Sequence, residues 1–224
     1  MIGKTILIAG GLLEEDFVLK VLQDPSVNFI IAVDRGLEFL HAHKINPQMI
    51  VGDFDSATSS VLQSYEDDHS ITIYRCNPIK DASDTEIALT KALEYHQTSD
   101  EIRNNQIIIL GGTGHRLDHF WGNVQSLKLA LDAQVEIFML DRRNRIRLIK
   151  YKTILRKESS FGKYFSLFPL GSDVPGLSIK GAKYDLTNYT LSSYTSRCIS
   201  NEYQEDTVEI SFPQGVVVLM ETCD

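Results

Sequence analysis

Two aspartates lie one residue apart in the stretch VGDFDS, residues 51–56. Asp53 and Asp55 follow an apolar run, and two carboxylates this close repel one another unless a cation lies between them. Mg²⁺ prefers oxygen ligands and often bridges protein carboxylates to substrate phosphates. We therefore expect Asp53 and Asp55 to bind Mg²⁺ together with a polyphosphate. The alternative is a strand-to-helix loop in which Asp55 or Ser56 caps the next helix.

A second acidic cluster is KDASDTEIAL, residues 80–89. Ser83 and Glu86 have the spacing of a capping box, and Asp81 and Asp84 suit the positive end of a helix. A cap needs only one or two of these groups. Lys80, Asp81 and Asp84 would in addition supply one cation for a phosphate and two carboxylates for a metal ion.

A third cluster is GGTGHRLDH, residues 111–119. Its glycines allow close backbone approach, the helix that follows offers unpaired N–H groups, and Arg116 can bind phosphate oxygens with two parallel hydrogen bonds. The spacing differs from GxGxxG, and no Lys-Ser/Thr pair follows as in a P-loop. The stretch predicts an anion-binding loop, with a plain tight turn as the alternative. His119 is either functional or an ordinary helix-surface histidine.

Short apolar runs alternate with helix-period segments up to about residue 142. Several runs are apolar at consecutive positions, which is typical of parallel strands buried on both faces, and ligands bind beyond the carboxyl ends of such strands. Helices are expected over 83–95 and 117–133. The expected strands are 5–10, 29–34, 49–53, 71–75, 106–112 and 135–140, and the apolar face expected for the second helix is Leu117, Phe120, Trp121, Val124, Leu127 and Leu131.

The pattern changes at residues 141–146. From there, short alternating segments such as 164–170, 177–181, 207–212 and 216–220 are separated by Gly, Pro, Ser and Asn, which favours a small antiparallel β domain. We therefore predict an α/β protein in two parts: a mainly parallel α/β sheet domain over 1–142 and a smaller all-β sandwich over 143–224.

Composition excludes some classes of protein. With a formal net charge of −8, we expect the protein to lack the basic surface that nucleic-acid binding requires. No segment has the length of a membrane span or the apolar core of a signal peptide, so we expect a cytoplasmic protein without a membrane partner. Cys76, Cys198 and Cys223 have no metal-site or disulfide pattern and are expected to be reduced thiols.

The polar clusters carry more acid than base. This excess is unsuitable for bare phosphate, but it suits a nucleotide that arrives with one or two Mg²⁺ ions, as in phosphoryl transfer. The acidic members are Asp53, Asp55, Asp81, Asp84 and Asp118, and the basic ones are Lys80 and Arg116.

VGDFDS, KDASDTEIAL, GGTGHRLDH and SNE at 200–202 occur in the order seen in thiamine pyrophosphokinases, which the chain resembles over nearly its whole length. The resemblance implies transfer of the diphosphoryl group of ATP to the hydroxyl of thiamine, with Mg²⁺, giving thiamine diphosphate and AMP. It also implies a homodimer in which an α/β nucleotide-binding catalytic domain is followed by a thiamine-binding β-sandwich, with thiamine held at the dimer interface.

The resemblance also assigns residues. Asp53, Asp55 and Asp84 would surround Mg²⁺ and the triphosphate. Our own candidates for the base that takes the hydroxyl proton are Asp84 and Asp55, with a metal-bound water as the alternative. Tyr184, Ser200 and Asn201 would contact thiamine. Nucleotide or phosphate contacts would come from Lys80, Asp81, Thr113, Gly114, Arg116, Asp118, His119 and Asn123. Arg35 and His115 depart from the family pattern, which bears on nucleotide selectivity.

Two other functions fit parts of the sequence. An aspartyl phosphatase would use a DxDx[T/V] motif, but in DFDSAT the threonine is one position late and the motif follows the third strand. A nucleotide sensor would use the glycine loop and Mg²⁺, yet would need neither so many carboxylates nor the SNE segment.

Overall fold

The computed structural model describes residues 2–54, 59–77, 79, 81–100, 102, 105–114 and 116–224. The expectations for Asp55, Lys80 and His115 therefore lie outside the described residues. The chain divides into two compact units, Met1–Arg142 and Arg143–Asp224, and each is described by itself.

A parallel sheet forms the centre of the first unit. In the described part its strands follow the order β6-β5-β1-β2-β3-β4, and each neighbouring pair runs parallel. Consecutive apolar residues such as Ile6–Ile8 are fully buried, as expected for strands covered on both faces. The strands are β1 (Lys4–Ile8), β2 (Val27–Val33), β3 (Met49–Gly52), β4 (Thr72–Arg75), β5 (Gln106–Leu110) and β6 (Ile137–Leu140).

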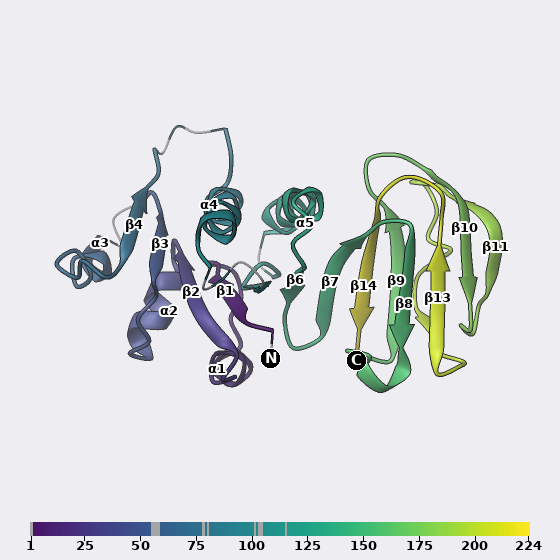
Figure 1. The fold of residues 1–224 in the computed structure, drawn as a ribbon, viewed down its shortest axis with the longest axis horizontal. Helices are drawn as coiled ribbons and strands as arrows, with labels where there is room; N and C mark the ends of the chain where they lie inside the picture. Colours follow the sequence, from purple (N-terminus) through teal and green to yellow (C-terminus); the bar gives the residue numbers. More distant parts are fainter. Residues whose placement is uncertain are drawn as a thin grey trace. The chain divides into compact units, whose positions relative to one another are not determined.

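Helices cover both faces of this sheet. Figure 1 shows α4 and α5 on one face and α1 and α2 on the other. From β1 the chain moves outward to β4, then returns to place β5 on the other side of β1, so the connections after β1 and β5 diverge. Such a switch point opens a crevice beyond the strand ends. The helices are α1 (Glu15–Leu22), α2 (Gly36–Ala42), α3 (Ser59–Leu62), α4 (Asp84–Thr98) and α5 (Leu117–Asp132).

The two helices predicted from the sequence are present, with one correction. Ser83 caps α4, because its hydroxyl accepts a hydrogen bond of 3.2 Å from the N–H of Glu86. In α5, Val124 is buried as expected, but Leu117 and Trp121 are 78% and 43% exposed. The single apolar face predicted for α5 was therefore wrong at its start, because the helix begins at the carboxyl edge of the sheet, where a pocket opens.

Two antiparallel sheets form the second unit, in the orders β12-β9-β14-β7 and β11-β10-β13-β8. Apolar side chains from both sheets, among them Phe165, Leu177, Val208 and Val217, pack into one core. The elements are β7 (Asn144–Ile149), β8 (Lys152–Arg156), η1 (Lys157–Ser159), β9 (Tyr164–Pro169), β10 (Val174–Lys180), β11 (Leu186–Leu191), β12 (Asn201–Glu202), β13 (Thr207–Ser211) and β14 (Val217–Thr222).

A buried carboxylate ties several of these segments together. Glu221 on β14 is 1% exposed and accepts hydrogen bonds of 2.7 and 2.9 Å from Arg145 on β7. The hydroxyl of Tyr203 donates to the same carboxylate at 3.2 Å, and burial raises the pKa of that hydroxyl. Removing one member of a buried ion pair leaves an uncompensated charge, so Glu221 and Arg145 depend on each other. The hydrogen bond from Tyr203 to Glu221 fixes the position of the chain just after β12.

The three cysteines, Cys76, Cys198 and Cys223, are free thiols. Among the described residues, no helix combines the length and the apolar character that crossing a membrane would demand.

We predict that His96 makes the first unit sensitive to acid. The ring is 3% exposed, its Nε2 lies 3.3 Å from the hydroxyl of Thr5, and burial lowers its pKa below the ordinary value of 6.5. The unfolded chain therefore binds a proton near pH 6.5 that the folded chain does not, so the free energy of unfolding should fall as the pH drops below 6.5. His96→Gln should weaken this fall, as measured by urea denaturation on either side of pH 6.5.

His43 provides a control of opposite sign. The carbonyl of Phe39 and the carboxylate of Glu15 raise its pKa, so its contribution is present below pH 6.5 and is lost as the pH rises through the folded-state value. His43→Gln should therefore steepen the loss of stability in acid. An unchanged pH dependence in His96→Gln would contradict the prediction.

Candidate active site

The loops after β1 and β5 approach each other so closely that only glycine fits between them. The N–H of Gly11 donates to the carbonyl of Gly111 at 3.0 Å, and a Cβ atom on Gly11 would lie 2.2 Å from that oxygen. Gly111 has φ of +69°, and its Cβ would lie 2.4 Å from the carbonyl of Ala9. The sequence allows this approach because glycine has no Cβ and tolerates positive φ.

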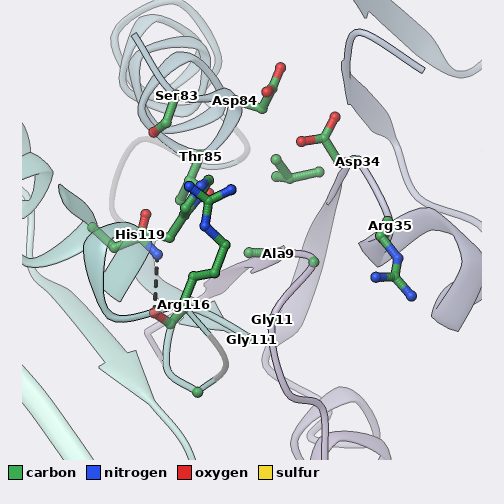
Figure 2. A pocket seen from close by; sticks show the side chains of 15 residues that line it. Ala9, Gly11, Asp34, Arg35, Ser83, Asp84, Thr85, Gly111, Arg116 and His119 are labelled. Atoms are coloured by element: carbon green, nitrogen blue, oxygen red, sulfur yellow. Dashed lines mark hydrogen bonds between the residues drawn. The ribbon is translucent and has the colours of Figure 1, made fainter. Parts of the chain in front are cut away.

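A pocket of about 280 Å³ opens beside this contact, at the switch point of the sheet. Figure 2 shows how side chains from several connections enter it, and the N-terminal turn of α4 forms one wall. The lining residues are Ala9, Gly10, Gly11, Val33, Asp34, Arg35, Ser83, Asp84, Thr85, Gly111, Gly112, Gly114, Arg116, His119 and Asn123.

The acidic side of the pocket consists of Asp34 and Asp84. Asp34 follows β2 with φ of +47°, and Gly52 leaves room for it, because a Cβ there would lie 2.3 Å from its Oδ1. Asp84 begins α4 directly after the Ser83 cap. Figure 2 shows the two carboxylates pointing toward one another, whereas the Arg35 guanidinium points away from Asp34. The pair supplies hard oxygen donors of the kind Mg²⁺ prefers.

The basic side of the pocket is Arg116, which begins α5 as its N-cap residue. Its guanidinium forms two hydrogen bonds with Asp118, Nε to Oδ1 at 3.1 Å and Nη2 to Oδ2 at 2.5 Å. Arg116 and the N–H of His119 lower the pKa of Asp118 to about 2, and the same ion pair raises the pKa of Arg116. The phosphate-binding group expected from the sequence is therefore already engaged by an internal carboxylate.

Five of the residues predicted for the nucleotide or metal site line this pocket: Asp84, Gly114, Arg116, His119 and Asn123. Four others do not line it: Asp53, Asp81, Thr113 and Asp118. Asp53 is half-buried just after β3, and Asp81 is exposed. Thr113 is buried and donates its hydroxyl hydrogen to Asp141 at 2.6 Å, which holds the loop in place. Asn123 is also buried and donates to the carbonyl of Gly112 at 3.0 Å.

The structure adds residues that sequence reasoning did not assign. Asp34 was given no role in the sequence analysis, and the Gly10–Gly11 pair after the first strand was not considered. A glycine pair directly after a buried strand was the available signal. Within the described residues, no three His, Cys, Asp or Glu side chains converge on one point, so the metal site expected at Asp53, Asp55 and Asp84 stays a prediction.

A second pocket, of about 380 Å³, lies in the second unit. Its lining residues are Lys183, Tyr184, Asp185, Leu186, Arg197, Cys198, Ile199 and Asn201. Tyr184 and Asn201 were predicted to contact a ligand together. Ser200, predicted with them, is exposed at φ of +57° and does not line the pocket.

Asn201 fixes the chain that carries Tyr184. Its Oδ1 accepts hydrogen bonds from the N–H groups of Tyr184 and Glu202, both at 3.0 Å, and its Nδ2 donates to the carbonyl of Tyr184 at 2.9 Å. A side-chain amide has two acceptor lone pairs and two donor hydrogens. Two of these four positions bind the backbone of Tyr184 and a third binds the N–H of Glu202, which leaves one N–H for a ligand.

The family described as "Thiamin pyrophosphokinase, catalytic domain" matches residues 24–139, and "Thiamin pyrophosphokinase, vitamin B1 binding domain" matches residues 152–217. The chain is 31% identical to the thiamine pyrophosphokinase of Bacillus subtilis over 195 residues, which cover 87% of each chain.

Solved structures of related proteins have the same fold. The crystal structure of thiamine pyrophosphokinase from Bacillus subtilis has a TM-score of 0.82 at 29% identity and covers 99% of both chains. The corresponding structure from Geobacillus thermodenitrificans has a TM-score of 0.80 at 29% identity and covers 99% of this chain and 98% of the other. The fold predicted from the sequence, an α/β unit followed by a smaller antiparallel β unit, is confirmed by these structures.

We predict that Gly111→Ala destabilises the protein by about 1–3 kcal/mol, because the new methyl group would contact the carbonyl of Ala9 at a φ that disfavours alanine. Gly122→Ala is the matched control. Gly122 lies within α5, and a Cβ there meets no atom within 4 Å, so alanine should stabilise by about 0.5–1 kcal/mol. Urea denaturation of both variants measures the difference, and equal stabilities would contradict it.

Proposed function

The chain belongs to the thiamin pyrophosphokinase family, and from that premise we propose that it transfers the diphosphoryl group of ATP to thiamine in an Mg²⁺-dependent reaction that releases AMP. As a member of this family it is a kinase-type transferase that forms thiamine diphosphate. The observation that carries the proposed donor is the pocket at the sheet switch point, where glycine backbone, carboxylates and a guanidinium surround one cavity.

We assign the nucleotide to this pocket. Gly11, Gly111 and Gly114 let phosphates approach the backbone closely, and the N-terminus of α5 offers N–H groups and partial positive charge to them. In this proposal Arg116 exchanges its carboxylate partner, Asp118, for a phosphate oxygen. Asp118 and a phosphate are both anions that can accept two parallel hydrogen bonds from the guanidinium. The exchange therefore replaces one charged, doubly hydrogen-bonded partner with another.

The carboxylates of Asp34 and Asp84 fit a bound Mg²⁺, with Asp53 and Asp55 as further candidate ligands from the GDFDS stretch. When bound, Mg²⁺ would neutralise phosphate charge and join these carboxylates to the nucleotide. Without a counter-cation, the acidic side of the pocket would repel the triphosphate. The carboxylates therefore make the proposed nucleotide site dependent on a divalent cation.

In the proposed reaction, the hydroxyethyl oxygen of thiamine attacks the β-phosphorus of ATP. The new O–P bond forms as the bond from the β-phosphorus to the α,β-bridging oxygen breaks, and AMP leaves with that oxygen. Arg116 stabilises charge on the phosphates, and the carboxylate of Asp84 or Asp55 accepts the hydroxyl proton. Positioning of the two substrates and electrostatic stabilisation by these side chains supply the catalysis.

We assign thiamine to the pocket of the second unit. Tyr184 is 59% exposed, which leaves part of its ring for an aromatic ligand, and the remaining N–H of Asn201 can bind a ring nitrogen. The exposed hydroxyl of Ser200 is next to Asn201 in sequence. Thiamine carries a positive charge, and an aromatic ring attracts a cation over its face.

We further propose that two copies of the chain form a homodimer. Each unit exposes large apolar side chains: Leu117 and Trp121, one turn apart on α5, in the first, and Tyr184 and Ile199, which line the pocket, in the second. Contiguous exposed apolar groups on a folded protein often mark an interaction surface. A second copy that covers them would exclude water from the proposed reaction.

The experiment that tests this function incubates the purified protein with thiamine, ATP and MgCl₂ and measures thiamine diphosphate and AMP by chromatography. We expect equal amounts of both products and none with EDTA. Asp84→Asn should lower kcat/KM by about 10²–10³-fold, because it removes a charged ligand from the pocket. Asp55→Asn tests the residue that lies outside the described part.

Asp67→Asn is the control, because Asp67 is an exposed aspartate that does not line the pocket, and its activity should stay within about twofold of wild type. Formation of ADP or free phosphate, or ATP consumption without thiamine, would overturn the proposed reaction. Hydrolysis of phosphoesters would favour the phosphatase, and ATP binding without turnover would favour the sensor.

For the dimer, we predict that the protein sediments as a species with twice the 25.3 kDa mass of one chain. Trp121 is the single tryptophan, so its emission should shift to shorter wavelength as the concentration rises and the indole leaves water. Leu117→Glu should lower the fraction of dimer. A monomer at all concentrations, measured by analytical ultracentrifugation, would contradict the prediction.

A further inference from the structure

Glu202 ends the SNE segment and has no role in the function proposed above. Its carboxylate lies 2.5 Å from Nζ of Lys183, which lines the second pocket, and 3.7 Å from Nζ of Lys163, which does not. The N–H of Lys183 also donates to the carbonyl of Glu202 at 2.9 Å. Glu202 therefore holds both the backbone and the side chain of Lys183 without lining the pocket itself.

The ion pair between Glu202 and Lys183 affects the charge balance of this pocket. Two cations, Lys183 and Arg197, and one anion, Asp185, are among its lining residues. Arg197 lies over the ring of Tyr189 at 4.8 Å, and Lys183 lies 5.6 Å from the ring centre of Tyr184. Without another carboxylate, the pocket would carry an excess positive charge next to the aromatic ring that a ligand would contact.

We propose that Glu202 is a positioning residue that sets the charge preference of this pocket. It draws the ammonium group of Lys183 to itself and cancels its charge, so that the pocket can accept a cationic heteroaromatic ligand. The inference rests on the proposed function, which assigns thiamine to this pocket. Loss of the carboxylate would leave the charge of Lys183, which lies over the ring of Tyr184 at 5.6 Å, unbalanced and able to repel a cation there.

The proposal predicts an effect on binding of the cation rather than on chemistry. One unbalanced charge within several ångströms of a bound cation, at the dielectric of a protein surface, changes affinity by about three- to tenfold. Glu202→Gln should therefore raise KM for thiamine by about three- to tenfold and leave kcat and KM for ATP near their wild-type values.

The decisive experiment compares ligands and second substitutions. Calorimetry should show weaker thiamine binding to Glu202→Gln, but equal binding of the uncharged aminopyrimidine fragment of thiamine. The double variant Glu202→Gln/Lys183→Met should have the same KM for thiamine as Lys183→Met alone, because the ammonium group that Glu202 balances is then absent. Adding Lys163→Met to Glu202→Gln should leave KM for thiamine raised, because Lys163 does not line the pocket. Glu202→Asp keeps the charge and should stay close to wild type.

Each outcome decides the question. Equal loss of thiamine and of the uncharged fragment, or an unchanged KM in Glu202→Gln, would overturn the proposal. Rescue by Lys163→Met as well as Lys183→Met would also overturn it, since the effect would then be a general surface charge. If the wild-type protein forms no thiamine diphosphate, the proposed function fails instead, and calorimetry still reports on the charge preference of the pocket.

Discussion

The close contact between the loops after β1 and β5 is the constraint on which the first unit depends. Gly11 and Gly111 share a backbone hydrogen bond at a spacing that admits no side chain on either residue. Because the sheet order reverses at this point, the contact defines the floor of a crevice whose walls come from other connections. Asp34, Asp84 and Arg116 line one cavity beside this contact.

In the second unit, a series of polar contacts, some of them partly buried, supports the pocket. The carboxylate of Glu221 holds Tyr203, the residue after β12, and the β12 residues Asn201 and Glu202 in turn hold the segment with Tyr184 and Lys183. An isolated bridge between Ala182 and Tyr203 joins the same two segments. A ligand at this pocket would therefore meet side chains whose positions are fixed by hydrogen bonds behind them.

The sequence predicted the parts of the fold that depend on local pattern. Continuous apolar runs indicated parallel strands, and the spacing of Ser83 and Glu86 indicated the cap that starts α4. Prediction from the sequence failed where the tertiary structure determines whether a residue is buried or lines a pocket. Leu117 and Trp121 have the periodicity of core residues but lie past the edge of the sheet. Asp34 could be assigned to the pocket only when the ends of β1, β2 and β5 were seen together, since nothing in the local sequence gives strand order.

The pairing of Arg116 with Asp118 implies competition at the anion site. An anion must displace an attached carboxylate that is always present at high local concentration, so weakly charged anions such as chloride would compete poorly. A triphosphate that also contacts backbone N–H groups and a cation, as we propose, would offset the lost ion pair. In the proposed reaction, AMP would keep fewer of those contacts than the triphosphate, and the return of Asp118 to the guanidinium would favour its departure. The same internal carboxylate would thus discriminate among anions and assist turnover.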